Sequence, residues 1–194
     1  KEELATTAIY IEQEVLKENV GCQDQVSATY GGFNLIEFSK GKKFEVTPLI
    51  LKKEKLELLN KSLMLFFTGF TRTASDIAQE LVDSLQQKKK EKELSIMCQM
   101  VYEGVKILNS SSDNLKDFGK LLHESWLVKR GLSSRISNPF IDEIYEQAIK
   151  AGAIGGKILG AGGGGFILFF VEPELHNKVK DRLNKLLYVP FEFE

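Results

Sequence analysis

Residues 157–170 read KILGAGGGGFILFF, and this stretch decides the fold. One apolar run ends at Leu159, six small residues follow at 160–165, and a second apolar run begins at Phe166. Such a run of small residues exposes backbone N–H groups and lets another molecule approach them closely. The pattern therefore predicts two strands joined by a loop that can hold a phosphate or a neighbouring loop.

Two nucleotide-binding motifs have similar glycine patterns and are excluded. The glycines at 160, 162 and 165 fit G-x-G-x-x-G, but the dinucleotide-binding form needs a helix after its third glycine, whereas residues 166–171 are typical of a buried strand. The G-x-x-x-x-G-K-[ST] loop fails because Ala151 and Ile158 stand at its first and last positions. A plain hairpin turn is the alternative, but such loops usually have roughly 2–5 residues. We therefore favour a loop that faces a ligand or a domain.

Composition sets broad limits on the function. With 194 residues, one domain is the default and two small ones are possible. The 26 basic and 27 acidic side chains leave a net charge of −1, so no nucleic-acid partner is expected. The two cysteines, Cys22 and Cys98, are too few for a disulfide framework and lack metal-binding spacing, which fits the cytoplasm. The sequence contains no membrane-length apolar run and no signal-like start.

Hydrophobic spacing and turn residues predict an α+β fold. The first helix is expected to bury Leu4, Ala8, Ile11 and Val15, and Pro139 opens a helix that follows Ser137 or Asn138 as its cap. Helices are predicted at residues 2–17, 25–30, 53–60, 73–108 with a break at 86–92, 114–129, 139–150 and 174–187. Strands are predicted at residues 33–38, 44–51, 63–67 and 188–193, and on both sides of the glycine loop.

Several motifs together resemble the GHMP small-molecule kinases. Residues 21–34, GCQDQVSATYGGFN, are similar to the G-x-x-D-Q segment of that family, and residues 159–166 match its third, C-terminal motif. The segments TGFTRTA at 68–74, LHESW at 122–126 and SNPFID at 137–142 resemble the sugar-kinase branch that contains heptose phosphate kinases. The matches extend from near the first residue to about residue 171, so they cover most of the chain.

The resemblance implies a fold and an activity. It implies an ATP-dependent sugar kinase that uses Mg²⁺ and phosphorylates a small sugar or sugar phosphate, most plausibly a heptose 7-phosphate at its anomeric hydroxyl. Residues 1–52 would be the end of the N-terminal kinase domain, and residues 53–194 the ferredoxin-like C-terminal domain. The alternatives are another sugar-1-kinase of the L-fucose or galactose type, or a non-catalytic sugar-binding regulatory module on the same scaffold. The presence of Asp24 argues against the non-catalytic module.

Two family motifs that precede the G-x-x-D-Q segment, including the one that wraps the ATP phosphates, are absent here. Residues 131–134 read GLSS and imitate that phosphate motif, but they lie far downstream and are followed by Arg135 where a small residue should open a helix. The chain is therefore expected to be a fragment that is inactive without the missing region. No metal ligand is assigned within it.

Asp24 is the candidate catalytic residue. It follows a glycine-containing turn and begins a helix, where backbone N–H groups and the helix dipole favour an ionised carboxylate. Such a carboxylate can accept a hydroxyl proton during phosphoryl transfer. The alternative is that Asp24 only caps the helix, which is common for Asp. The resemblance favours catalysis, and Gln25 would then orient the sugar or the Asp24 carboxylate.

The remaining candidates bind substrate or nucleotide. Arg72, near a predicted helix start, could hold an anionic substrate group or could be an exposed arginine beside a Thr cap. Arg135 and Asn138 are candidate substrate contacts, with helix capping the stronger role for Asn138. His123 and Trp126 are assigned to the core, because Leu127 replaces the second histidine of an H-E-x-x-H zinc motif. The loop assigned to phosphate comprises Gly160, Ala161, Gly162, Gly163, Gly164 and Gly165.

Overall fold

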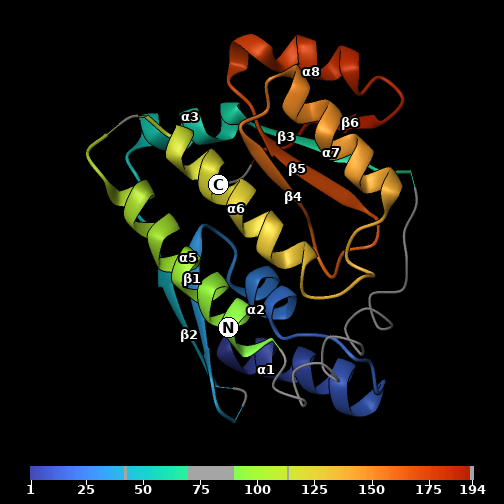
Figure 1. Cartoon of the computed structure of the whole chain (residues 1–194). Coiled ribbons are helices and arrows are strands. Elements are labelled where there is room, and N and C mark those ends of the chain that lie inside the picture. The colour runs from blue at the N-terminus through green and yellow to red at the C-terminus, as the bar shows by residue number, and fades with distance from the viewer. Residues whose placement is uncertain (42, 70–89, 113, 193–194) are drawn as a thin grey trace. The chain divides into compact units, whose positions relative to one another are not determined.

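A computed structural model describes residues 1–41, 43–69, 90–112 and 114–192 (Figure 1). The chain divides into two compact units, the N-terminal unit of residues 1–50 and the C-terminal unit of residues 51–192. Helices and antiparallel strands occur in both units, so the predicted α+β class is confirmed.

The N-terminal unit packs two helices and a hairpin around a small core. Its elements are α1 (Glu2–Tyr10), the π-helical turn η1 (Ile11–Val15), α2 (Gln23–Tyr30), β1 (Asn34–Ser39) and β2 (Lys43–Pro48). The two strands form the predicted antiparallel hairpin, with Phe38 opposite Phe44. Ala5, Ile9 and Val26 are its buried centre, and side chains from both strands pack against them.

The buried face of the first helix differs from the prediction. Ala5 and Ile9 are buried, whereas Leu4 is 63% and Val15 is 59% exposed. The predicted stripe is one residue out of register, because α1 packs on α2 through Ala5, whose small side chain permits a close approach. The π-helical turn adds a second departure, since its wider turn breaks the i, i+4 spacing after Tyr10.

The C-terminal unit holds the remaining elements. They are α3 (Lys53–Ser62), β3 (Leu63–Phe67), α5 (Glu91–Asn109), α6 (Lys116–Arg130), α7 (Pro139–Ala151), β4 (Gly155–Ile158), β5 (Phe166–Phe170), the 3₁₀ turn η2 (Pro173–Leu175), α8 (His176–Arg182) and β6 (Leu187–Val189). The prediction for residues 63–67 has the bounds of β3. The last helix is shorter than predicted and ends at Arg182, and the helical prediction for 73–89 lies outside the described residues.

Four strands of this unit form one antiparallel sheet in the order β4-β5-β3-β6. Met64 lies opposite Phe169, Ile158 opposite Ile167, and Phe66 opposite Tyr188. Along the chain, helices follow β3, a hairpin joins β4 to β5, and another helix precedes β6. This is the β-α-β-β-α-β arrangement of the predicted ferredoxin-like domain.

The core of the C-terminal unit lies between the sheet and helices α6, α7 and α8. Phe66 and Phe169 are fully buried there with Trp126 of α6. Figure 1 shows α6 beside β4, and two glycines set that approach. A Cβ atom at Gly155 would lie 2.0 Å from the carbonyl oxygen of Gly119, so the two backbones meet where no side chain fits. This packing brings the C-terminal turn of α6 to the glycine loop.

Candidate functional site: the glycine loop and the Asp24 turn

The glycine loop, residues 159–165, connects β4 to β5 in the C-terminal unit. Four of its glycines have positive φ angles: +64° at Gly160, +110° at Gly162, +75° at Gly163 and +87° at Gly165. Residues with a side chain rarely adopt this backbone region, which explains the glycine run. The helix that a dinucleotide-binding motif requires is absent, because β5 begins directly after Gly165.

The carbonyl oxygens of the loop are held by groups from outside it. Lys129 Nζ donates to the Gly160 oxygen at 2.6 Å and to the Ile158 oxygen at 3.2 Å. The backbone N–H and the hydroxyl of Thr68 donate to the Gly165 oxygen at 2.8 and 2.9 Å. A longer bond of 3.5 Å joins Asn138 Nδ2 to the Gly163 oxygen. Three carbonyl oxygens of the loop, at Gly160, Gly163 and Gly165, are therefore held from outside it.

The donors of the loop are left largely unused. The N–H of Leu159 closes the hairpin onto Phe166, and the N–H of Gly163 donates to the Ile136 oxygen at 2.9 Å. Among the described residues, the N–H groups of Gly160, Ala161 and Gly162 donate to no other group. Successive free amides in a tight loop form a concave donor surface that suits an anion. In the described structure these three N–H groups are thus donors that no protein acceptor occupies.

Positive charge lies beside this loop. Lys129 is only partly accessible to solvent, in the last turn of α6. Burial, together with the positive charge of Lys157, lowers the pKa of Lys129 from 10.5 to about 8. Burial also lowers the pKa of Lys157, on β4. Neither lysine forms an ion pair with a carboxylate in the part of the chain that the structure describes. Near neutral pH Lys129 is still mostly protonated, so it adds to the attraction for an anion.

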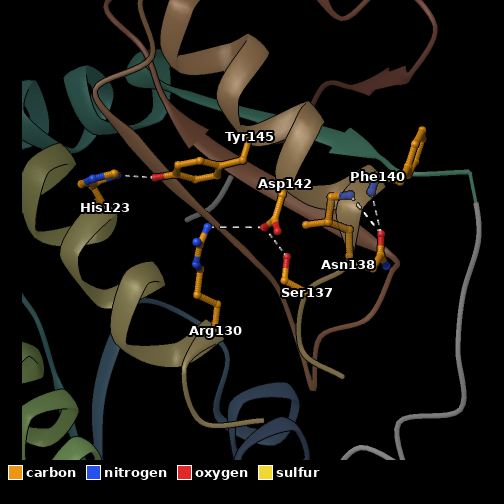
Figure 2. A network of polar contacts seen from close by, with 8 residues as sticks. His123, Arg130, Ser137, Asn138, Phe140, Asp142 and Tyr145 are labelled. Carbon is orange, nitrogen blue, oxygen red and sulfur yellow. Dashed lines mark hydrogen bonds and ion pairs between the residues drawn. The ribbon is translucent and has the colours of Figure 1, made fainter. Parts of the chain in front are cut away.

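The connection from α6 to α7 shapes one side of the loop. Asn138 Oδ1 accepts hydrogen bonds from the N–H groups of Phe140 and Ile141, both at 3.1 Å, so Asn138 caps α7 as predicted. Figure 2 shows this cap beside a second set of contacts, in which Asp142 accepts a bond from Ser137 at 2.7 Å and pairs with Arg130 at 3.4 Å. Asn138 therefore links the start of α7 to Gly163.

Arg135 and Arg72 are the other two predicted substrate-binding residues. Arg135 lies exposed in the connection before Ile136, and its backbone N–H donates to Ser133 Oγ at 3.1 Å. The GLSS segment in this connection does not open a helix, as predicted. Arg72 lies outside the described residues.

His123 and Trp126 have the structural role that the sequence predicts. Trp126 is fully buried, and His123 Nδ1 forms a 2.7 Å hydrogen bond with the Tyr145 hydroxyl (Figure 2). The two rings of that pair are stacked, with centroids 5.8 Å apart. Burial raises the pKa of the Tyr145 hydroxyl to about 12. This hydroxyl therefore stays protonated and acts as a fixed link between α6 and α7.

Asp24 lies in the first turn of α2, in the N-terminal unit, and its side chain is exposed. Cys22 occupies the N-cap position and makes no side-chain cap, so Asp24 does not cap this helix. Gln25 is buried, and its Nε2 donates to Glu12 Oε2 of η1. Its Oε1 has no hydrogen-bond partner among the described residues. The turn thus presents a carboxylate to solvent while its neighbour is anchored inside the unit.

Sequence reasoning missed Glu12, Thr68 and Lys129 as parts of these sites. Glu12 lies in an acidic stretch of a helix, and Lys129 lies in the last turn of one, where charged residues usually face water. Thr68 ends a strand and carries no motif of its own beyond the family segment. Only the fold brings Thr68 and Lys129 to the glycine loop.

The described residues contain neither a metal-binding cluster nor a membrane-spanning helix. No group of three or more His, Cys, Asp or Glu side chains in those ranges could hold a metal ion. No helix within them has the length and apolar character needed to cross a membrane.

Comparison with known proteins relates the chain to sugar kinases. Residues 107–189 match the family described as GHMP kinases C terminal. The chain is 38% identical to D-glycero-alpha-D-manno-heptose 7-phosphate kinase from Campylobacter jejuni, over 92% of the chain and 52% of that protein. It is 26% identical to the bifunctional fucokinase/GDP-fucose pyrophosphorylase of Arabidopsis thaliana, over 95% of the chain and 18% of that protein.

A solved structure agrees with this relationship. The crystal structure of a D-glycero-D-manno-heptose 1-phosphate kinase from Bacteriodes thetaiotaomicron superposes with a TM-score of 0.61 and 28% identity, covering 97% of the chain and 51% of that structure. The chain thus spans about half the length of each of the two heptose kinases it matches.

Proposed function

This chain belongs to the GHMP kinases, and we propose that it forms the C-terminal part of an ATP-dependent sugar kinase whose acceptor is a sugar phosphate, most plausibly a heptose 7-phosphate at its anomeric hydroxyl. The observation that carries the proposal is the glycine loop, in which the Gly160, Gly163 and Gly165 oxygens accept bonds while three consecutive N–H groups donate to no other described residue. The 38% identity to a heptose 7-phosphate kinase supports the substrate.

Residues 1–52 and residues 53–194 have different parts in this proposal. The first segment is the end of the N-terminal kinase domain and carries Asp24, and the second is the C-terminal domain with the glycine loop. In the cytoplasm, where we place the enzyme, the free thiols of Cys22 and Cys98 are stable.

Asp24 acts as the general base. Its exposed carboxylate accepts the proton of the sugar hydroxyl while the hydroxyl oxygen forms a bond to the γ-phosphorus of ATP. The bond from that phosphorus to the β–γ bridging oxygen breaks, and ADP leaves with the electron pair. Gln25 supports this role indirectly, because its bond to Glu12 anchors the turn that carries Asp24.

The glycine loop binds phosphate oxygens in this proposal. The N–H groups of Gly160, Ala161 and Gly162 donate to them, and Gly163, Gly164 and Gly165 shape the return to β5. Asn138 is occupied by the α7 cap and by Gly163, so it influences the substrate through the loop. Arg135 and Arg72 are the proposed contacts to the anionic group of the sugar.

ATP brings Mg²⁺ to the site in this proposal. Mg²⁺ in phosphoryl transfer is usually held by substrate phosphates with one or two carboxylates. Among the described residues no group of three or more His, Cys, Asp or Glu side chains could hold a metal ion, so the phosphates of ATP would supply most of its ligands here. The ion would neutralise charge that develops on the transferred phosphoryl group.

An assay of the full-length protein with Mg²⁺-ATP tests the proposal. The acceptors are D-glycero-D-manno-heptose 7-phosphate, L-fucose and galactose, with ADP release and ³¹P NMR of the product as readouts. We expect a sugar 1-phosphate from the heptose phosphate. Preference for fucose would favour the fucokinase alternative, which the 26% identity to the Arabidopsis thaliana enzyme supports. Sugar binding without ADP release would indicate the non-catalytic module.

A further inference from the structure

Lys129 is the only described residue whose side chain bonds to the first half of the glycine loop. Its ammonium group donates to the carbonyl oxygens of both Ile158 and Gly160. We propose that Lys129 is a positioning residue, which orients the peptide between Gly160 and Ala161 so that the Ala161 N–H faces the bound phosphate. The identity of that phosphate as ATP or sugar phosphate rests on the proposed function.

The argument starts from the geometry of the peptide unit. In a trans peptide the carbonyl group and the following N–H point in opposite directions within one plane. A bond of 2.6 Å from Lys129 to the Gly160 oxygen therefore turns the Ala161 N–H away from Lys129. That N–H is one of the free donors of the loop, so the lysine determines where this donor points.

This peptide needs an external anchor because little else restrains it. A Cβ atom at Gly160 would have no neighbour within 4 Å, and Gly160 has a φ of +64°. Glycine allows the adjacent peptide planes to rotate at low energetic cost. The other anchors act later in the loop, at Gly163 and Gly165. Without Lys129, rotation of the peptide would replace the N–H by a carbonyl oxygen, which repels phosphate.

The placement of Lys129 costs stability, which points to a role in function. Its ammonium group is partly removed from water, no carboxylate pairs with it among the described residues, and Lys157 of β4 adds a like charge nearby. A partly desolvated cation without a carboxylate partner is unfavourable in a fold. Such perturbed groups cluster at functional sites, and here the geometry gives the reason for the perturbation.

Lys55 of α3 provides a matched control within the same unit. It is only 5% exposed, and its Nζ donates to the Ser110 oxygen at 2.6 Å and to the Ile107 oxygen at 3.4 Å, at the end of α5. As at Lys129, the ammonium group donates to two backbone carbonyl oxygens, although Lys55 is buried and Lys129 is only partly buried. Because Lys55 does not contact the glycine loop, its substitution should change stability without changing the position of the loop.

The test compares Lys129→Met, Lys129→Arg and Lys55→Met in the full-length protein. One readout is the backbone amide NMR signal of Ala161 in protein labelled with ¹⁵N-alanine, with and without Mg²⁺-ATP. Lys129→Met should shift the Ala161 signal of the free protein and abolish its response to nucleotide. Lys129→Arg should restore part of that response, and Lys55→Met should leave the signal unchanged.

Kinetics supply the second readout. We expect Lys129→Met to lower kcat/KM by about 10-fold to 100-fold, the effect of losing a charge-assisted hydrogen bond. Lys55→Met should reduce the melting temperature yet keep kcat/KM within about twofold, as expected for a site that contributes only to folding. The proposal is wrong if Lys129→Met behaves like Lys55→Met in both readouts. Absence of kinase activity in the wild type would refute the proposed function instead, and the Ala161 signal would still decide the role of Lys129.

Discussion

The N–H of Gly163 donates a 2.9 Å hydrogen bond to the carbonyl oxygen of Ile136. This bond joins the glycine loop to the connection before α7, which also carries Arg135 and the capping Asn138. A buried backbone bond of this kind is geometrically demanding, because both partners are main-chain groups that no rotamer change can adjust. This bond therefore ties the middle of the loop to the segment that leads into α7.

The neighbouring glycines should differ in their tolerance of a side chain. At Gly162 a Cβ atom would lie 2.9 Å from the Ile136 oxygen with φ at +110°, whereas at Gly160 the space is open and φ is +64°. We expect Gly162→Ala to lower the free energy of unfolding by about 2–4 kcal/mol, and Gly160→Ala by about 1 kcal/mol. Urea denaturation measures both. Equal losses would mean that the loop can move away from Ile136.

Asp24→Asn in the full-length protein should remove catalysis without unfolding it. The substitution keeps the shape of the side chain but eliminates the proton acceptor, so kcat should fall by about 10²–10⁴-fold. Because Asp24 is exposed and does not cap α2, the free energy of unfolding should change by only about 0.5 kcal/mol. Nucleotide affinity should be almost unaffected in a calorimetric titration. A variant with normal kcat would exclude Asp24 as the base.

Raising the pH should weaken phosphate binding by the loop. The pKa of Lys129 is lowered to about 8, so its positive charge is lost as the pH rises through that value. A neutral amine holds the Gly160 carbonyl less firmly and attracts the phosphate less. The dissociation constant for Mg²⁺-ATP should increase between pH 7 and 9, and Lys157→Met should move this increase to higher pH, because the like charge is removed.

The free energy of unfolding should rise with pH, although phosphate binding weakens. In the unfolded chain Lys129 keeps its ordinary pKa of 10.5, so between about pH 8 and 10 the unfolded state binds more protons than the folded one. The free energy of unfolding therefore rises with pH in this window, and Lys157 acts in the same direction. Above pH 10 the raised pKa of Tyr145 opposes the trend. Denaturation at several pH values should give a smaller rise for Lys129→Met than for the wild type.

Tyr145→Phe should affect stability alone. The variant keeps the ring that packs near Trp126 and Phe169 but leaves His123 Nδ1 without its partner. An unsatisfied partly buried group costs about 1–3 kcal/mol, and thermal unfolding would report this loss. A change in kcat at a temperature where the variant is fully folded would contradict the structural role of this pair.

Local chemistry explains what the sequence could predict. Asn138 followed by Pro139 specifies a capped helix start through contacts within four residues, and α7 begins there. The bounds of β3 follow from five apolar residues before Thr68, and the glycine run marks the loop before β5. Each of these features is set by residues close together in the sequence, so it can be predicted without knowing the tertiary contacts.

Features that depend on distant partners could not be predicted. Leu4 and Ala5 are equally acceptable on a buried face until the packing of α2 selects Ala5. Lys129 looks like a solvated helix end, because the carbonyl groups it holds lie about thirty residues later in the sequence. The buried state of Gln25 likewise depends on Glu12, in an element that periodicity assigns to an ordinary helix.

The contact between Gly119 and Gly155 controls the position of the far end of α6. The backbone approach at these glycines sets how closely α6 lies against β4, and Lys129 lies ten residues further along the same rigid helix, about 15 Å away. A methyl group at Gly155 would push the helix outward and withdraw the ammonium group from Gly160. In a screen for inactive alleles, substitutions at this contact would therefore share the biochemical signature of the phosphate loop, although they touch no ligand.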